Sequence, residues 1–270
     1  MYLPIGKFLL DSGCLAFILT GRYNRSCDEI PMRDEEVKVG DKPRGKADVA
    51  VRGRLLRSAT GIFTRKGYAS ATVREIVADA GVTKPALYYY FRNKEGIYLE
   101  LMREGFSKFD SLLDASRGEP GDAVRKIKRV CDEVFGLFLE HIGVARVMYA
   151  IYYGPPQGAP FFDFDAYHFK FQDMVRCQVG EGIRTGEFRK RDPVDMAWAI
   201  IGAVNVAMES QLCHPEIGLG KEGLARVLDV LFEGIRAKTR PARRSASGPR
   251  GRYRGAGPRS RKGIRKGEPL

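Results

Sequence analysis

The sequence predicts an all-α protein of about nine helices, with a small N-terminal helix-turn-helix domain and a larger helical domain behind it. From about residue 46 onward, apolar residues recur close to the 3.6-residue period of a helix. Short connectors containing Gly and Pro separate these stretches, and no run of residues has the pattern of a strand. The chain has 270 residues, 44% of them hydrophobic, which suffices for a small domain joined to a larger one.

Residues 1–45 show no clear period and predict an N-terminal extension, either disordered or an artefact of start-site choice. Met32 opens an ordinary polar arm, so we expect translation to start there. The apolar run Phe8 to Thr20 is the one candidate targeting segment. Asp11 interrupts it, it is too short to span a bilayer, and no A-x-A-like cleavage site follows. We therefore expect no membrane association, with a secretory signal as the disfavoured alternative.

The first expected helix starts at about residue 46 and ends at Gly67, with an apolar stripe made by Val51, Leu55, Ile62 and Phe63. The second covers Thr72–Asp79. Thr72 and Glu75 match a capping box, in which a hydroxyl and a carboxylate three residues apart satisfy each other's free amides. Its short apolar face consists of Ile76, Val77 and Ala80.

A turn at Gly81 leads to the third expected helix, Thr83–Phe91. Thr83 can cap this helix, and Pro85 is tolerated in its first turn, where no internal amide donor is needed. Two short helices joined by a short turn form a helix-turn-helix candidate. We place this domain at residues 46–93.

A helical projection at about 100° per residue gives each side of the third helix a different role. Leu87 and Phe91 face the core. The outward side carries Pro85, Ala86 and Tyr89, and the flanks carry Tyr88 and Tyr90. Small residues allow close approach to base edges, and tyrosine and threonine hydroxyls can bind phosphate oxygens. The alternative is that these tyrosines belong to a core or pack against a partner.

The second domain, residues 94–237, is expected to contain six helices: Lys94–Arg117, Ala123–His141, Gly143–Tyr153, Phe161–Thr185, Pro193–Leu212 and Lys221–Ala237. Residues 238–270 are rich in Arg, Gly, Ser and Pro and predict a disordered basic tail. This tail is either a dispensable extension, which we favour slightly, or an arm that attracts phosphates.

The charge is unevenly distributed along the chain. Lys and Arg total 46 against 33 acidic residues, a formal charge of +13. Asp48 to Lys94 holds nine basic and three acidic residues, whereas Glu95 to Arg236 is mildly acidic. This polarity favours a nucleic-acid-binding head on a body with another role.

Residue types that carry catalysis or bind metals form no convincing group. The five cysteines are scattered without a CxxC pair, which argues against a disulfide framework and a zinc site and favours a reducing cytoplasm. The three histidines, His141, His168 and His214, lie far apart and near no clear nucleophile. We therefore expect no enzyme activity, no cofactor and no metal.

The run GVTKPALYYYFRNKEGIYLELM, preceded by FTRKGY and ATVREIVADA, resembles the N-terminal domain of the tetracycline-repressor (TetR) family. The resemblance covers about Asp48 to Met102. It implies a cytoplasmic, nucleoid-associated bacterial homodimer, most often a repressor, with a DNA-binding head and a ligand-responsive body. Tyr90 stands where members often carry histidine. By position in the motif, the implied DNA contacts are Thr72, Thr83, Lys84, Ala86, Tyr88, Tyr89, Tyr90 and Lys94.

The body contains an aromatic-rich stretch from Met148 to Phe171. It predicts either ordinary bundle core or, as family members usually have, an apolar pocket for a small ligand. The expected lining residues are Met148, Tyr149, Tyr152, Tyr153, Phe164, Tyr167, Phe171 and Trp198. The last two helices resemble those with which members form a four-helix dimer interface. Completion of the monomer core is the alternative for that pair.

The function predicted from the sequence is a dimeric regulator that binds a palindromic operator in double-stranded DNA and is released by a small hydrophobic ligand. One rival is a general nucleic-acid-binding protein that uses the basic tail. A second rival, an all-α enzyme built around the aromatic body, lacks an acid/base or nucleophile pair.

Overall fold

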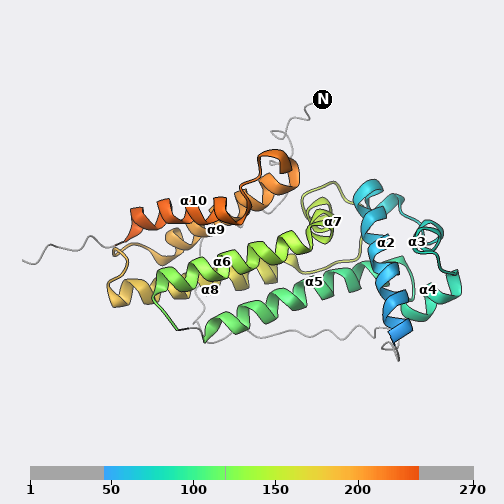
Figure 1. The fold of residues 1–270 in the computed structure, drawn as a ribbon, viewed down its shortest axis with the longest axis horizontal. Coiled ribbons are helices and arrows are strands. Elements are labelled where there is room, and N and C mark those ends of the chain that lie inside the picture. The colour runs from blue at the N-terminus through green and yellow to red at the C-terminus, as the bar shows by residue number, and fades with distance from the viewer. Residues whose placement is uncertain (1–45, 119, 237–270) are drawn as a thin grey trace, which may run out of the picture. The chain divides into compact units, whose positions relative to one another are not determined.

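The computed structural model describes residues 46–118 and 120–236. Within them the chain forms nine α-helices, one 3₁₀ turn at Pro215–Ile217 and an isolated bridge between Phe188 and Arg236 (Figure 1). The helices are α2 (Lys46–Ser70), α3 (Val73–Ala80), α4 (Lys84–Tyr90), α5 (Lys94–Arg117), α6 (Ala123–Glu140), α7 (Ile142–Tyr152), α8 (Phe164–Thr185), α9 (Pro193–Cys213) and α10 (Gly220–Ile235). The all-α prediction is confirmed. The expected N-terminal extension, Met32 start and basic tail lie outside the described residues.

Side-chain caps set most helix starts. Asn93, Asp122 and Asp192 each accept a hydrogen bond from an amide in the first turn of α5, α6 and α9. The expected start of α8 at Phe161 is wrong, because Asp163 accepts from the Ala166 amide and caps the helix at Phe164. α2 extends to Ser70 but is interrupted at Gly67, whose φ of 77° and ψ of 163° are not helical.

The head, by which we mean α2, α3, α4 and the first half of α5, has its own buried core. Leu55, Ile76, Leu87, Ile97 and Tyr98 are each fully buried in it. α7 packs across α2 and contributes Val147 to the same core, although the second half of α5 and all of α6 separate it from the rest of the head in the chain. The core of the head therefore depends on a helix that the sequence places in the second domain.

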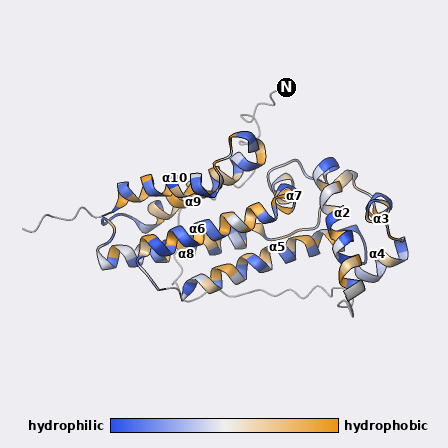
Figure 2. Ribbon diagram, in the orientation of Figure 1, coloured by the Kyte–Doolittle hydropathy of each residue, from blue (hydrophilic) through white to orange (hydrophobic). Residues whose placement is uncertain are grey.

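The body, by which we mean the second half of α5 with α6, α8, α9 and α10, has a second buried core. α8 packs on α9 and α6, and α10 packs on α9 and α6. Figure 2 shows hydrophobic and hydrophilic residues alternating along α6 and α10, as expected for helices with one buried side. α5 contributes to both cores, through Leu113 in the body and Met102 in the head.

α9 has the length and mean hydropathy of a candidate membrane-spanning helix, and one-third of its most apolar 18-residue stretch is buried. The core helices of globular proteins meet the same criterion, and Ile200, Val204 and Ala207 of α9 are fully buried in the body. Exposed Val206 lies on another side of this helix. α9 therefore carries apolar side chains beyond those that it buries in the core of the body.

Two cysteines, Cys131 and Cys213, are free, the first buried and the second exposed. Cys177 is disulfide-bonded. The sequence argument against a disulfide framework did not anticipate the bond at Cys177. It rested on the absence of closely spaced pairs, and spacing carries no information on contacts between distant segments.

Candidate nucleic-acid interface

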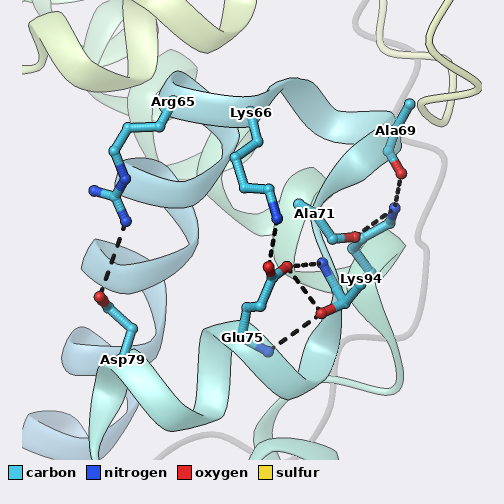
Figure 3. A network of polar contacts seen from close by, with 8 residues as sticks. Arg65, Lys66, Ala69, Ala71, Glu75, Asp79 and Lys94 are labelled. Atoms are coloured by element: carbon cyan, nitrogen blue, oxygen red, sulfur yellow. Dashed lines mark hydrogen bonds and ion pairs between the residues drawn. The ribbon is translucent and has the colours of Figure 1, made fainter.

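α3 begins at Thr72 with the capping box expected from the sequence. The Glu75 amide donates to the Thr72 hydroxyl oxygen at 3.3 Å, and the Thr72 amide donates to Glu75 Oε2 at 3.1 Å. Lys66 of α2 forms an ion pair with the same carboxylate, as Figure 3 shows. The hydrogen bond from Lys66, followed by those from Thr72, lowers the pKa of Glu75 below its ordinary value. These contacts fix the start of the first helix of the motif.

The end of α3 is held to α2 by Ser58. This buried hydroxyl lies 2.7 Å from Asp79 Oδ2 and 3.0 Å from the Ile76 carbonyl oxygen. Gly81 follows in the left-handed conformation, with φ of 62° and ψ of 43°, and closes α3. Thr83 then caps α4 by accepting from the Ala86 amide at 3.4 Å. The two helices and the turn expected from the sequence are thus present.

α4 exposes one side and buries the other. Leu87 and Phe91 are buried, with exposed fractions of 0% and 3%, as the helical projection predicts. Tyr88 and Tyr89 are exposed by 53% and 48%. The start of the helix adds further accessible side chains, namely Thr83, Lys84 and Pro85, with Ala86 half-buried beside them.

Tyr90 does not lie on the flank of α4 where the helical projection placed it. Its exposed fraction is 6%, and its hydroxyl donates to Asp48 Oδ1 at 2.7 Å. That hydrogen bond and burial raise the pKa of Tyr90 to about 12. Its expected role as a DNA contact is corrected, because the ring lies in the head core and the hydroxyl proton is used by a carboxylate 42 residues earlier.

Lys94 is also used inside the protein. Its Nζ donates to the carbonyl oxygens of Tyr68 at 2.9 Å, Ala69 at 3.3 Å and Ala71 at 3.0 Å, two of which Figure 3 shows. The ammonium also lies 4.3 Å from the centroid of the Tyr68 ring. An ammonium has three donors, so no donor is left for a phosphate. The expected direct DNA contact is therefore corrected to a structural role, and burial lowers the pKa of Lys94.

Arginines that the motif did not single out provide accessible charge. Arg54 and Arg57 on α2, Arg74 on α3 and Arg92 after α4 are all exposed. None of them forms an ion pair within the described part of the chain. Their only signal in the sequence was the excess of basic over acidic residues in this segment.

Six of the eight expected ligand-lining residues belong to one connected string of aromatic rings. This string extends from Phe106, Phe162 and Phe164, which pack against the head core, to Phe171 in the body core. Adjacent ring centroids along it lie between 4.3 and 6.4 Å apart. In order of contact the string comprises Tyr149, Tyr153, Tyr152, Phe164, Phe162, Tyr167, Phe106, Phe109 and Phe171. Phe106 and Phe109 of α5 were not anticipated, although their three-residue spacing places them on one side of a helix.

The other two expected lining residues make no ring contact with this string. Met148 packs against the head core, and Trp198 lies 6.1 Å from His168, centroid to centroid. Burial lowers the pKa of His168 and raises that of Tyr149. The structure thus links most of the expected residues but divides the set between two cores.

A different cavity, a groove of about 490 Å³, lies between α6 and α10. Charged residues such as Arg125, Lys128 and Lys221 line it, and none of the expected ligand-lining residues does. Two of these bases are already paired, Lys128 with Asp229 at 2.6 Å and Lys221 with Asp132 at 2.9 Å. In the described part of the chain, no group of three or more His, Cys, Asp or Glu residues could hold a metal ion.

These features define a helix-turn-helix protein whose exposed second helix carries tyrosine, threonine and lysine above a helical body. Residues 55–101 match the model of "Bacterial regulatory proteins, tetR family". The repressor KstR2 of Mycobacterium tuberculosis is 31% identical over 157 residues, which cover 56% of this chain and 75% of that protein. The chain belongs to the tetR family: it is a DNA-binding transcriptional regulator and not an enzyme.

Two further comparisons describe how far the similarity extends. The regulator YdgC of Bacillus subtilis is 35% identical over 103 residues, which cover 37% of this chain and 53%, about half, of that protein. SmeT is a repressor from Stenotrophomonas maltophilia. The structure of its complex with triclosan matches this chain with a TM-score of 0.56 and 19% identity. That match covers 70% of this chain and 93% of SmeT, and at 19% identity it indicates a shared fold only.

Proposed function

We propose that the protein is a dimeric repressor that binds a pseudo-palindromic operator and is released by a small apolar or aromatic ligand. The observation that carries this proposal is the accessible side of α4, where Tyr88 and Tyr89 stand exposed beside Thr83 and Lys84. A helix with small residues at its start and hydroxyl-bearing residues beyond can enter a major groove and bind its phosphate walls.

The proposed DNA contacts are narrower than those expected from the sequence. The Thr83 hydroxyl oxygen accepts a hydrogen bond from the Ala86 amide, so the hydroxyl can still donate its proton to a phosphate. Lys84 supplies an exposed charge. Tyr88 and Tyr89 offer phenol hydroxyls, and Ala86 permits close approach to base edges. Thr72 is exposed but donates its hydroxyl proton to Glu75 Oε2 at 2.9 Å, so it would act mainly by placing α3.

Dimerisation through α9 and α10 is supported by apolar side chains that the monomer leaves exposed. Val206 of α9 is exposed by 62% and Val230 of α10 by 72%. Trp198 and Val227, each 37% exposed, lie on the same two helices. A second copy of this pair would remove these side chains from water in a two-fold interface.

The aromatic string supports a ligand of apolar or aromatic character. Its rings could stack on a flat ligand, and the Tyr152 hydroxyl, which donates to Asp165, shows that polar groups for orientation lie among them. SmeT, which shares this fold, forms a complex with triclosan. Repression is favoured over activation because KstR2 is a repressor.

A competition shift assay tests the specific DNA binding. Labelled DNA from upstream of the protein's own gene is challenged with unlabelled copies and with random duplex. A specific regulator typically prefers its site by about 10³–10⁷-fold. Equal competition by random duplex would instead support general nucleic-acid binding through the basic tail. The site of action is the bacterial cytoplasm, and association with the nucleoid follows if the operator is found.

A further inference from the structure

One side chain between α7 and α8 joins the second half of the chain to the head. The Nε2 of Gln157 donates to the Ala150 carbonyl oxygen of α7 at 3.1 Å. Its Oε1 accepts from the backbone amide of Tyr68 in α2 at 2.8 Å. Tyr68 lies 89 residues earlier in the chain, so this carboxamide connects two distant segments with both of its polar atoms.

The interruption of α2 at Gly67 makes room for this contact. A φ of 77° lies in the region that favours glycine. A Cβ at this position would lie only 2.7 Å from Gln157 Oε1, closer than two such atoms can approach. Gly67 therefore both bends the chain and admits the carboxamide.

The corner at residues 67–72, which contains this interruption, also contacts the helix-turn-helix. The Tyr68 carbonyl oxygen accepts from Lys94 Nζ at 2.9 Å and from the Ala71 amide at 3.3 Å. Lys94 is the first residue of α5, and Ala71 precedes Thr72, the residue that caps α3. The position of Tyr68 thus affects where α3 and α5 begin.

The other end of the segment is anchored in the aromatic string. The ring centroid of Phe162 lies 5.2 Å from that of Phe106 and 5.8 Å from that of Tyr167. Phe164, which opens α8, lies 5.7 Å from Phe106 by the same measure. A ligand that separates these rings would therefore displace the segment that carries Gln157.

We propose that Gln157 is the positioning residue that couples the aromatic string to the helix-turn-helix. Its two hydrogen bonds hold the corner at residues 67–72 in the orientation that places α3 and α4. Displacement of the segment at residues 154–163 breaks the bond to Tyr68 and releases this corner. The coupling rests on the proposed function, since it supplies the path between ligand and operator.

Amide hydrogen exchange on the full-length protein tests the contact without DNA. In Gln157→Ala the Tyr68 amide loses its acceptor, and we expect exchange in the peptide covering residues 67–76 to accelerate about 2- to 12-fold, the range of one net hydrogen bond. Phe161→Ala is the matched control, because this neighbour in the same segment is 87% exposed. Unchanged exchange in Gln157→Ala, or equal acceleration in the control, overturns the proposal.

Gln157→Glu separates the hydrogen bond from the packing of the segment. Glutamate keeps an oxygen that can accept from the Tyr68 amide, so we expect its exchange to lie closer to wild type than that of Gln157→Ala. Equal acceleration in the two variants assigns the effect to packing and overturns the role of the bond. Protection of α9 and α10 in every variant verifies that the body remains folded.

A second arm measures coupling in the reverse direction, since linkage is reciprocal. The probe is the duplex that wild-type protein selects from a random pool. We expect this duplex to slow exchange at residues 154–163 in wild type and in Phe161→Ala, and not in Gln157→Ala. Slowing in Gln157→Ala equal to that in wild type overturns the coupling. If wild type selects no duplex, the proposed function fails, whereas the DNA-free arm still decides on the contact.

Discussion

Tyr89 exposes 48% of its surface on α4, whereas the adjacent Tyr90 exposes 6% and donates to Asp48. We expect Tyr89→Ala to weaken operator binding about tenfold, because a groove contact contributes on the order of 1 kcal/mol or more, and to leave dimerisation intact. Tyr90→Phe should lower the free energy of unfolding by about 1 kcal/mol through loss of one hydrogen bond. Shift assays and urea denaturation measure the two effects. Normal stability of Tyr90→Phe would contradict the role given to Asp48.

The two lysines at the ends of the motif also differ in exposure and in their contacts. Lys84 is exposed, whereas Lys94 donates to three carbonyl oxygens. We expect Lys84→Ala to reduce the slope of log K against log salt by about one unit, as loss of a phosphate contact does. Lys94→Met should leave the slope unchanged and lower stability by about 1–3 kcal/mol, since three carbonyl oxygens each lose a hydrogen bond. A reduced slope for Lys94→Met would instead indicate that Lys94 contacts DNA directly.

At the scale of single elements, the capping box of α3 gives the head a dependence on pH. The folded-state pKa of Glu75 is lowered, so its stabilising contribution is present above the ordinary value near 4.5 and is lost as the pH falls through the folded pKa. Glu75→Gln should therefore be less stable than wild type at pH 7, and the difference should shrink below about pH 4.5. Thermal melts across this range measure it. A constant difference would show that the charge of Glu75 is not involved.

Thr72→Ala removes the other half of the box. Loss of an N-cap hydroxyl typically costs about 1 kcal/mol, and the same loss is expected here from urea denaturation. Thr72→Ser, which keeps the hydroxyl, is the matched control and should retain most of the stability. Equal losses in the two variants would assign the effect to the methyl group instead.

Elements fixed by local chemistry could be predicted from the sequence, and elements fixed by distant contacts could not. The capping box, the turn at Gly81 and the burial of Leu87 depend on residues within about one helical turn. Tyr90 is buried because Asp48 lies opposite it, and Lys94 turns inward because the kink at Gly67 presents carbonyl oxygens. No local pattern encodes either contact.

The same reason explains why the expected ligand-lining residues are divided between two cores. Aromatic composition predicted either bundle core or an apolar pocket, and ring contacts from Tyr149 to Phe171 bring most of these residues together. The pattern could not show that Met148 belongs to the core of the head, since α7 was assigned to the second domain by its position in the chain. Nor could it show that α5 contributes Phe106 to the string.

At the scale of the whole molecule, the proposed function requires two copies. Val206 and Val230 lie exposed on α9 and α10, where a charge would oppose association without entering the core. We expect Val206→Glu and Val230→Glu each to yield folded monomers with a wild-type helical signal, measured by sedimentation and circular dichroism. Because a monomer engages only one half-site, operator affinity should fall about 100-fold or more.

Phe161→Glu is the matched control for both valine variants, because it places the same charge on a side chain exposed by 87% outside α9 and α10. It should remain dimeric and bind the operator normally. Dimers in all three variants would exclude this helix pair as the interface. Monomers that keep full operator affinity would refute the requirement for two copies, and one head would then suffice for specific binding.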